Sequence, residues 1–234
     1  PHVVKRNIFP NVLNDIRLYY IEYFDYFMNQ KNTLGLNSYF MDLDDPLELF
    51  KLWMSEAEKK EINDPNALSL ATTSKNNEPS VRMVLLKGVS RKGFVFYTNL
   101  NSPKSSDLKQ NSKAAMCFHW KSIQRQIRIS GTVALVTPKE ADTYFNSRPY
   151  ESRIGAWASD QSKVMSTREE FLKKINEFKS KYKDEKNLPR PQHWSGWCLN
   201  PSSIEFWLGD KYRIHERLKY NKVSNNWKKE ILYP

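Results

Sequence analysis

Seven short β-type runs, separated by polar turn stretches, constrain the fold of this chain more than any other feature. They lie between residues 67 and 209 and read ALSLATT, SVRMVLLKG, GFVFYT, AAMCFHW, QIRISGTVALV, GWCLN and SIEFWLG. Runs of this length and spacing are typical of an antiparallel barrel or sandwich. In QIRISG, Ile127 and Ile129 fall on one parity while Gln126 and Arg128 fall on the other. A strand here would turn its apolar side chains to a core and its polar ones to water or to a polar ligand.

Helices are predicted between and before these runs. Asp45 can cap a helix that begins with Pro46 and carries an apolar stripe through DPLELFKLWMSEA. Further helices are expected to begin after Thr137 and after Thr167, where a glutamate three residues later completes a capping box. We expect these helices to pack around a β core, giving a mainly β, α+β fold.

The length and charge of the chain narrow its class without identifying a ligand. A chain of 234 residues can form one globular domain. Residues 1–42 lack strand periodicity, so we predict an N-terminal appendage there, possibly helical, and a globular domain over residues 43–234. The 37 Lys and Arg residues against 26 Asp and Glu give a net charge of +11. This excess favours anionic partners, although a solubilising surface explains it as well.

Several classes of protein are disfavoured. Only two cysteines, Cys117 and Cys198, are present, which argues against a secreted disulfide scaffold and favours a reducing, cytoplasmic location. The run IRLYYIEYFDYFM carries three charges and is too short to span a bilayer, so no membrane association is expected. Cys117 and His119 share a strand face, but no second ligand pair follows at a zinc-like spacing, so no metal is expected. Glycine-rich nucleotide-binding and hydrolase motifs are absent from the sequence.

Two stretches combine cations with groups that bind anions. Arg82 and Lys87 bracket an apolar run, which is also how a buried strand would extend two cationic ends into water. In NSPKSS, Ser102 can cap a short helix, Pro103 suits its first position and Lys104 follows directly. Free amide groups and a cation would then converge at a phosphate site.

Two later stretches add candidate ligands. In YFNSRPYES, Tyr144, Arg148 and Ser152 surround a helix end and turn, where a guanidinium, a hydroxyl and a phenol suit a phosphate monoester. In RIHER, Arg213 and Arg217 flank a histidine at alternate positions, which would share one face if the segment were extended.

Taken in order, the motifs RMVLLKG, FYTN, RQIRISG, YFNSRP, IGAWASDQS and EFWLGDKYRIHER resemble those of the pyridoxamine (pyridoxine) 5′-phosphate oxidases. The resemblance covers about residues 43 to 234. It implies an FMN-binding split β-barrel with peripheral helices, and a homodimer with FMN bound in a cleft to which both subunits contribute. It also implies oxidation of pyridoxamine 5′-phosphate and pyridoxine 5′-phosphate to pyridoxal 5′-phosphate, with O2 as acceptor and hydrogen peroxide as by-product.

The resemblance also implies roles for individual residues. The positions that match FMN ligands of the family are Arg82, Met83, Val84, Leu85, Tyr97, Thr98, Lys104, Gln126, Gln161, Ser162, Trp207 and Arg217. The positions that match ligands of the substrate are Lys87, Tyr144, Arg148, Ser152, Arg213 and His215, of which Arg213 and His215 are the expected catalytic pair.

The chain departs from the family pattern at the phosphate site. The family usually has Ser-Arg-Lys where this chain has Ser102, Pro103 and Lys104, so one guanidinium is missing. The family's N-terminal substrate-covering residues have no counterpart that aligns with residues 1–42.

Two other functions fit parts of the sequence. A flavin-binding or haem-binding split-barrel protein without oxidase activity would share the fold. A nucleic-acid-binding module would account for the charge and the aromatic residues, but the arginines group in strand motifs and no RNA-recognition motif is present, so no nucleic-acid partner is expected.

Overall fold

The computed structural model describes residues 34–234, and its contacts divide the chain into two units between Asp44 and Asp45. Residues 34–44 form turns. The possible helix of the appendage falls on residues outside the described range, and the predicted domain boundary at residue 42 stays a prediction. Across the described part of the chain, every helix is too short or too polar to traverse a lipid bilayer.

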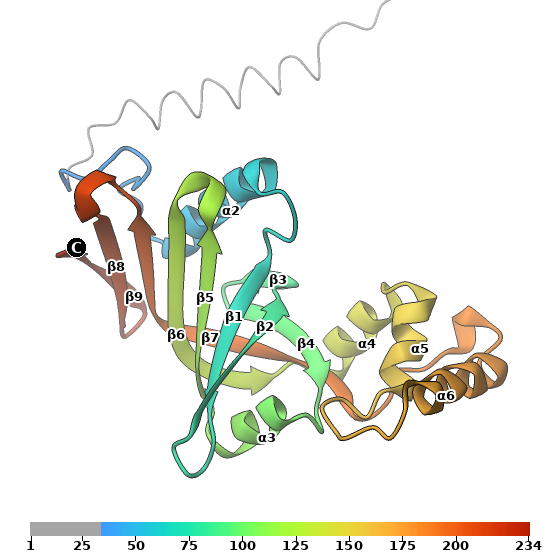
Figure 1. Ribbon diagram of the computed structural model, residues 1–234. Helices are drawn as coiled ribbons and strands as arrows, with labels where there is room; N and C mark the ends of the chain where they lie inside the picture. Colours follow the sequence, from blue (N-terminus) through green and yellow to red (C-terminus); the bar gives the residue numbers. More distant parts are fainter. Residues whose placement is uncertain (1–33) are drawn as a thin grey trace, which may run out of the picture. The chain divides into compact units, whose positions relative to one another are not determined.

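The second unit is built on one antiparallel sheet whose strands follow the order β2-β1-β5-β6-β7-β4-β3, with β8 pairing with both β7 and β9 (Figure 1). The strands are β1 (Ala67–Thr73), β2 (Pro79–Leu85), β3 (Gly88–Ser90), β4 (Gly93–Asn99), β5 (Lys113–Trp120), β6 (Arg125–Leu135), β7 (Trp194–Leu208), β8 (Glu216–Val223) and β9 (Asn226–Leu232). All their pairings are antiparallel.

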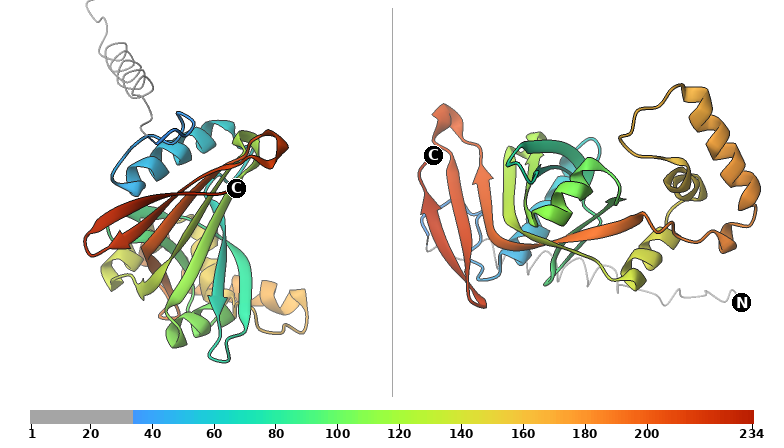
Figure 2. Two further views of the ribbon diagram at one scale, coloured as in Figure 1. Left: turned by 90° about the vertical axis from the view of Figure 1, so that its left-hand side faces the viewer. Right: turned by 90° about the horizontal axis from the view of Figure 1, so that it is seen from below.

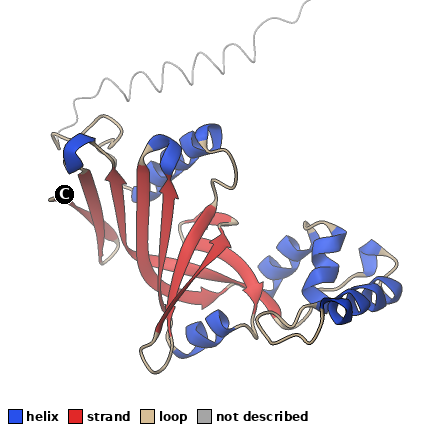
Figure 3. Ribbon diagram, viewed as in Figure 1, coloured by secondary structure: helices blue, strands red, loops and turns tan. Residues whose placement is uncertain are grey.

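Five α-helices accompany the sheet, and three of them gather beyond one end of it (Figure 3). They are α2 (Pro46–Lys60), α3 (Pro103–Gln110), α4 (Pro138–Asn146), α5 (Tyr150–Ala158) and α6 (Arg168–Lys181). Three predicted helix starts are confirmed by their caps: Asp45 accepts a hydrogen bond from Leu47 N–H at 2.9 Å, and Thr137 forms a capping box at the start of α4. Thr167 likewise accepts from the backbone of the third residue of α6.

Strand β7 is the long strand of the sheet that pairs with other strands on both of its edges (Figure 2). One of its edges pairs with β6, while its other edge pairs first with β4 and then with β8. Pro201 lies between these two segments and faces Gly131, while Ser203 faces Ser130, so Ser202 of β7 is the extra residue of a β-bulge. A proline cannot donate to a ladder, and a bulge bends the strand that carries the extra residue. Two runs that sequence periodicity separates, GWCLN and SIEFWLG, are therefore one bent strand.

The main core lies between the sheet and α2. Phe50 of α2 places its ring 4.9 Å from Phe94 and 5.4 Å from Phe118, both in edge-to-face geometry. Trp53, one turn further along, contacts Phe206 at 5.2 Å. Ring contacts of this kind add to the free energy of burying the apolar surface. Helix α2 thus closes the core on one face of the sheet.

Three elements of the structure were not predicted from the sequence, and the RIHER segment has a different conformation from the extended one considered for it. Strand β3, the β8–β9 hairpin and helix α5 have no clear periodicity and were not predicted as such. The residues of RIHER would share one face only if the segment were extended, and the structure does not meet that condition. Lys211–Arg213 forms a 3₁₀ turn in which Tyr212 and Arg213 have φ of 56° and 64°, and β8 begins only at Glu216. The left-handed turn removes Arg213 from the strand face that carries Arg217.

The bulge yields a stability prediction. A Cβ atom added at Gly131 would lie 2.1 Å from the carbonyl oxygen of Asn200, which is backbone and cannot rotate away. We expect Gly131→Ala to lower the free energy of unfolding by about 1 to 3 kcal/mol, as overpacking does elsewhere. Gly155→Ala is the control, because a Cβ there meets nothing within 4 Å and alanine favours the helix. Thermal unfolding of both variants at one protein concentration tests this, and equal melting temperatures would contradict it.

Candidate active site

A cavity of about 420 Å³ opens where β2, β4, the start of α3 and the turn between α4 and α5 meet. It is lined by Met83, Val84, Leu85, Lys87, Tyr97, Thr98, Lys104, Tyr144, Arg148, Pro149, Ser152, Gln161 and Trp194. Apart from Pro149 and Trp194, every lining residue belongs to the set predicted from the sequence. The fold therefore brings residues from six separate stretches of the sequence together around one cavity.

Lys104 is a buried cation without an acidic partner. Its side chain lies in the first turn of α3, and its Nζ is 3.1 Å from Thr98 Oγ1, 3.0 Å from Ser102 Oγ and 3.4 Å from Gln161 Oε1. None of the ion pairs in residues 34–234 includes it. Burial, with a smaller contribution from the nearby charge of Arg82, lowers the pKa of Lys104. A bound anion would supply the missing charge.

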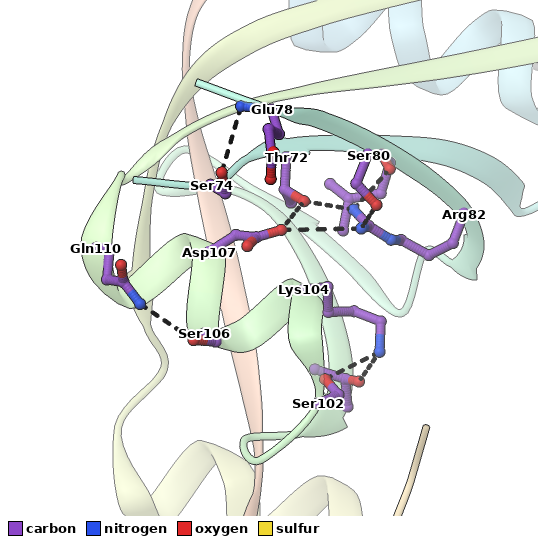
Figure 4. Close-up of polar contacts among 12 residues, drawn as sticks. Thr72, Ser74, Glu78, Ser80, Arg82, Ser102, Lys104, Ser106, Asp107 and Gln110 are labelled. Carbon is purple, nitrogen blue, oxygen red and sulfur yellow. Dashed lines mark hydrogen bonds and ion pairs between the residues drawn. The ribbon is translucent and has the colours of Figure 1, made fainter. Parts of the chain in front are cut away.

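Arg82 lies beside Lys104 and is held by neutral oxygens (Figure 4). Its Nη1 donates to Thr72 Oγ1 at 2.7 Å, and its Nη2 donates to Ser80 Oγ at 2.6 Å. Asp107 of α3 is 4.0 Å from Nη2. Burial lowers the pKa of Arg82, and the charge of Asp107 opposes that shift. Ser102 occupies the N-cap position of α3 as predicted, but its hydroxyl donates to the carbonyl of Asn99 at 2.7 Å instead of capping the helix.

Arg148 is the second cation of the cavity that lacks a partner. Its Nη1 is buried and has no hydrogen-bond partner among the described residues. Its guanidinium lies over the ring of Trp194, with the central carbon 4.8 Å from the ring centre. Burial lowers the pKa of Arg148. A buried donor of this kind is normally paired, so its position in a cavity wall fits an anionic ligand.

Three aromatic rings form one wall of the cavity. Tyr97 stacks on Tyr144 with ring centres 4.0 Å apart and lies nearly parallel to Trp194 at 5.2 Å. Burial raises the pKa of Tyr97, which keeps its phenol protonated. Trp194 was not predicted as a site residue. Its only signal in the sequence is its place in HWSGW at the start of a β run.

A second group of predicted residues forms a row across three strands. Gln126 on β6 pairs with Trp207 on β7, which pairs with Arg217 on β8. The ring of His215 lies 4.6 Å from that of Trp207. Its Nδ1 faces the backbone N–H of Asp210 at 3.2 Å. Because that backbone group can only donate, Nδ1 accepts, and the proton of the neutral ring lies on Nε2.

Glu205 fixes Arg217 and was missed by the sequence analysis. This carboxylate is 7% exposed, and its Oε1 accepts from Nε of Arg217 at 2.9 Å and from Nη2 at 2.7 Å. Arg128 donates to Oε2 at 3.3 Å, so the arginine of the polar strand face is paired with an acid. Arg217 also donates through Nη1 to the carbonyl of Tyr233 at 2.9 Å. These contacts use only part of the donor capacity of the Arg217 guanidinium, so it can still donate to another ligand.

The predicted site residues therefore fall into two groups within one chain. The cavity lining includes none of the predicted residues Arg82, Gln126, Trp207, Arg213, His215 and Arg217, and of these Arg82 lies beside the cavity, next to α3. Ser162, with a φ of 68°, lies next to Gln161 but lines a neighbouring cavity of about 310 Å³. We refer below to the cavity group, centred on Lys104 and Arg148, and to the strand row, Gln126, Trp207 and Arg217.

Comparison with known protein families identifies the family to which the chain belongs. Residues 54–182 match the model of the family described as pyridoxamine 5′-phosphate oxidase, which is more than half of the chain. The chain belongs to the pyridoxamine 5′-phosphate oxidase family. Residues 194–234 match a second model of that family, described as the pyridoxine 5′-phosphate oxidase C-terminal dimerisation region.

Curated relatives of the family are similar over nearly their whole length. The chain is 61% identical over 208 residues to the pyridoxine/pyridoxamine 5′-phosphate oxidase of Pelagibacter ubique, which covers 88% of this chain and 100% of that protein. It is 49% identical over 206 residues to the protein of the same name from Bartonella henselae, covering 87% and 99%.

A solved structure of the family confirms the split-barrel fold. PhzG from Burkholderia lata 383, in complex with tetrahydrophenazine-1-carboxylic acid, superposes with a TM-score of 0.79 at 29% identity, covering 85% of this chain and 97% of that one. An FMN-binding protein related to the family, from Nostoc punctiforme, superposes with a TM-score of 0.66 at 16% identity, covering 83% and 100%, and supports the fold alone.

The hydrogen bonds that Glu205 accepts from Arg217 and Arg128 yield a second stability prediction. Glu205→Gln leaves two guanidinium groups without their shared charge, and we expect a loss of about 1.5 to 3 kcal/mol, the range for hydrogen bonds to charged groups. Lys92→Ala is the control, because its ion pair with Glu140 is exposed and such pairs contribute about 1 kcal/mol or less. Urea unfolding measures both changes. Equal unfolding midpoints for the two variants would show that the contacts of Glu205 contribute no more than an exposed ion pair does.

Proposed function

We propose that this protein is an FMN-dependent oxidase that converts pyridoxamine 5′-phosphate and pyridoxine 5′-phosphate to pyridoxal 5′-phosphate with O2 as acceptor. The observation that carries the proposal is a cavity lined by two cations that have no acidic partner among the described residues: the buried Lys104, and the half-buried Arg148, whose Nη1 is buried. Both FMN and the substrate have a phosphate group, so the reaction requires two anion sites near one flavin. High identity to relatives named for this activity supports the same function.

The residues of the cavity fit FMN. We assign the FMN phosphate to Lys104, which lines the cavity in the first turn of α3, and to Arg82, which lies outside the lining but near enough for its charge to lower the pKa of Lys104. Thr98 and Gln161 already contact the Lys104 amine and would contribute hydroxyl and amide groups, and Ser162 follows in the same loop. Residues 83–85 offer strand backbone and side chains along the same wall. When bound, FMN accepts a hydride from the substrate and is reoxidised by O2, which yields hydrogen peroxide.

The opposite wall of the cavity suits the substrate. We assign the substrate phosphate to Arg148, with Lys87, Tyr144 and Ser152 around it. The buried Nη1 of Arg148 supplies a donor that an oxygen of the phosphate would satisfy. Tyr144, whose ring stacks on that of Tyr97, lines the same cavity and would help to exclude water.

The strand row would complete the site from a second copy of the chain. We propose a homodimer in which FMN lies at the subunit interface, since the row does not line the cavity of its own chain. The match of residues 194–234 to a dimerisation region supports this arrangement, and so do the exposed side chains of Val81, Met83 and Leu85 on the edge strand β2. An exposed apolar strand edge is normally covered by a partner.

In that arrangement the residues of the row and the β7–β8 turn would face the reacting atoms. Arg217, held by Glu205, places a cation where negative charge develops on the flavin, and Gln126 adds a hydrogen bond. We assign Arg213 and His215 to the pyridine ring of the substrate as the catalytic pair. With Nδ1 occupied by the backbone of Asp210, His215 can donate only from Nε2.

The activity itself is directly testable. The purified protein, loaded with FMN, is mixed with pyridoxine 5′-phosphate or pyridoxamine 5′-phosphate in air-saturated buffer. We expect pyridoxal 5′-phosphate to appear by absorbance in step with hydrogen peroxide. Tight FMN binding without formation of either product would favour a flavin-binding split-barrel protein that is not an oxidase. A steep salt dependence of binding to bulk RNA would instead favour a nucleic-acid-binding module.

Arg148 should control substrate affinity. We expect Arg148→Ala to raise KM roughly ten- to hundredfold with little change in kcat, because removal of a charged hydrogen bond costs about 1.5 to 3 kcal/mol. Arg91→Ala, which removes an exposed arginine outside the cavity, is the matched control. Steady-state kinetics at saturating FMN measure both, and an unchanged KM in Arg148→Ala would discredit the assignment.

Lys104 should make FMN binding sensitive to pH. Burial lowers the pKa of Lys104 in the free protein, whereas a bound phosphate favours its charged form. FMN affinity should therefore be full below that lowered pKa and fall as the pH rises through it. Above about pH 7 the phosphate is already a dianion. The group expected to titrate in this range is therefore the amine of Lys104. Fluorescence titrations between pH 7.5 and pH 10 test this against Lys104→Arg, whose side chain stays charged and should give a flatter profile.

A further inference from the structure

We propose that Thr72 and Asp107 are positioning residues that aim Arg82 at the phosphate end of the FMN site, an inference that rests on the function proposed above. Neither residue lines the cavity, and neither was singled out by the sequence motifs. They act through a relay of two hydrogen bonds whose direction is fixed by the chemistry of the three groups (Figure 4).

The direction of the relay follows from donor and acceptor capacity. Thr72 Oγ1 is 2.7 Å from Asp107 Oδ2 and 2.7 Å from Arg82 Nη1. A guanidinium can only donate, and an ionised carboxylate can only accept. The single hydroxyl proton of Thr72 must therefore point to Asp107, which leaves an oxygen lone pair for Arg82. Thr72 is 1% exposed, so water does not compete for either position.

The three groups come from three elements that meet at this point. Thr72 lies on β1, Arg82 lies on β2, and the two strands pair with Leu70 opposite Arg82. Arg82 Nη1 also donates to the carbonyl of Leu70 at 3.2 Å. Asp107 lies on α3, three residues after Lys104, so both cations of the phosphate site are tied to one helix. The relay thus sets the position of Arg82 relative to Lys104.

A direct ion pair does not account for Asp107 equally well. Its closest oxygen is 4.0 Å from Arg82 Nη2, beyond hydrogen-bond distance, while its bond to Thr72 is short. An acid beside a phosphate site also repels the ligand. In this chain Pro103 stands between Ser102 and Lys104 and contributes no charge, so the site depends on Arg82 and Lys104. The benefit of Asp107 must therefore come from orienting Thr72.

The experiment compares two flavins that differ only in the phosphate. Protein stripped of flavin is titrated with FMN and, separately, with riboflavin, and binding is followed by quenching of flavin fluorescence. Thr72→Val removes the hydroxyl at nearly constant volume, while Thr72→Ser keeps it. We expect Thr72→Val to weaken FMN binding about tenfold and to change riboflavin binding less than twofold. Thr72→Ser should stay within about twofold of the starting protein for both.

Two variants of Asp107 separate orientation from charge. Asp107→Asn keeps an oxygen that can accept the Thr72 proton, and we expect FMN binding equal to or tighter than that of the unsubstituted protein. Asp107→Ala removes the acceptor and should weaken FMN binding about as much as Thr72→Val does. This pair also keeps the test decisive if Thr72→Val fails to fold.

Each contrary outcome has one meaning. Equal weakening of FMN and riboflavin by Thr72→Val, or no change in either, would overturn the relay. Equal loss of FMN binding in Asp107→Asn and Asp107→Ala would assign the effect to charge and would overturn it too. Failure of the unsubstituted protein to bind either flavin would instead overturn the proposed function. Thermal unfolding of each variant identifies any that are destabilised as a whole.

Discussion

The pairing of β6 with β7 is the constraint on which the rest of this structure depends. β7 carries Trp194 at its start, in the wall of the cavity, and Trp207 near its end, in the strand row. A straight strand advances roughly 3.3 Å per residue, so these two positions would lie roughly 40 Å apart without the bend. The bulge opposite Ser130 and Gly131 curls the sheet between them but keeps them on separate segments, one paired with β4 and one with β8. One chain thus presents the cavity group and the strand row apart from each other, and the proposed dimer would bring the two groups together.

The lack of an acidic partner distinguishes Lys104 and Arg148 from the other mostly buried arginines of residues 34–234. The net charge of +11 is spread over many side chains and does not by itself locate a ligand. Five other mostly buried arginines of the described residues each pair with an acid: Arg82 with Asp107, Arg125 with Glu56, Arg153 with Glu185, Arg190 with Asp142 and Arg217 with Glu205. Lys104 and Arg148 have no such pair among the described residues, and their pKa values are lowered by burial. A bound anion would offset the cost of burying an unpaired charge, so these two residues are the ones that we propose as anion sites.

The features that the sequence predicts are those set by local periodicity and local hydrogen bonds. Ile127 and Ile129 are fully buried on β6, as their parity predicts, and Asp45 caps α2. The pairing of Glu205 with Arg217 could not be predicted, because it depends on the register of β7 against β8, and that hairpin has no strong periodicity. Trp194 was missed for a similar reason, since its role arises only where β4, α4 and β7 bring three rings together. Family motifs identified ligand positions, but only the structure separates them into a cavity group and a strand row.

The turn between β7 and β8 shows why the catalytic pair was the hardest part of the site to predict. Tyr212 and Arg213 both adopt left-handed backbone angles, which cost about 1 to 2 kcal/mol for each residue with a side chain. A turn without this strain would continue the strand and align Arg213 with Arg217, as alternation predicts. Instead the chain turns, Asp210 caps the turn through its contact with Lys211 N–H at 2.6 Å, and its own N–H meets Nδ1 of His215. Strain that persists at such a position is typical of functional segments, because neighbouring contacts must stabilise it. Here the strained turn fixes the tautomer of His215 and separates Arg213 from the strand row, so the two members of the proposed catalytic pair are positioned by backbone geometry.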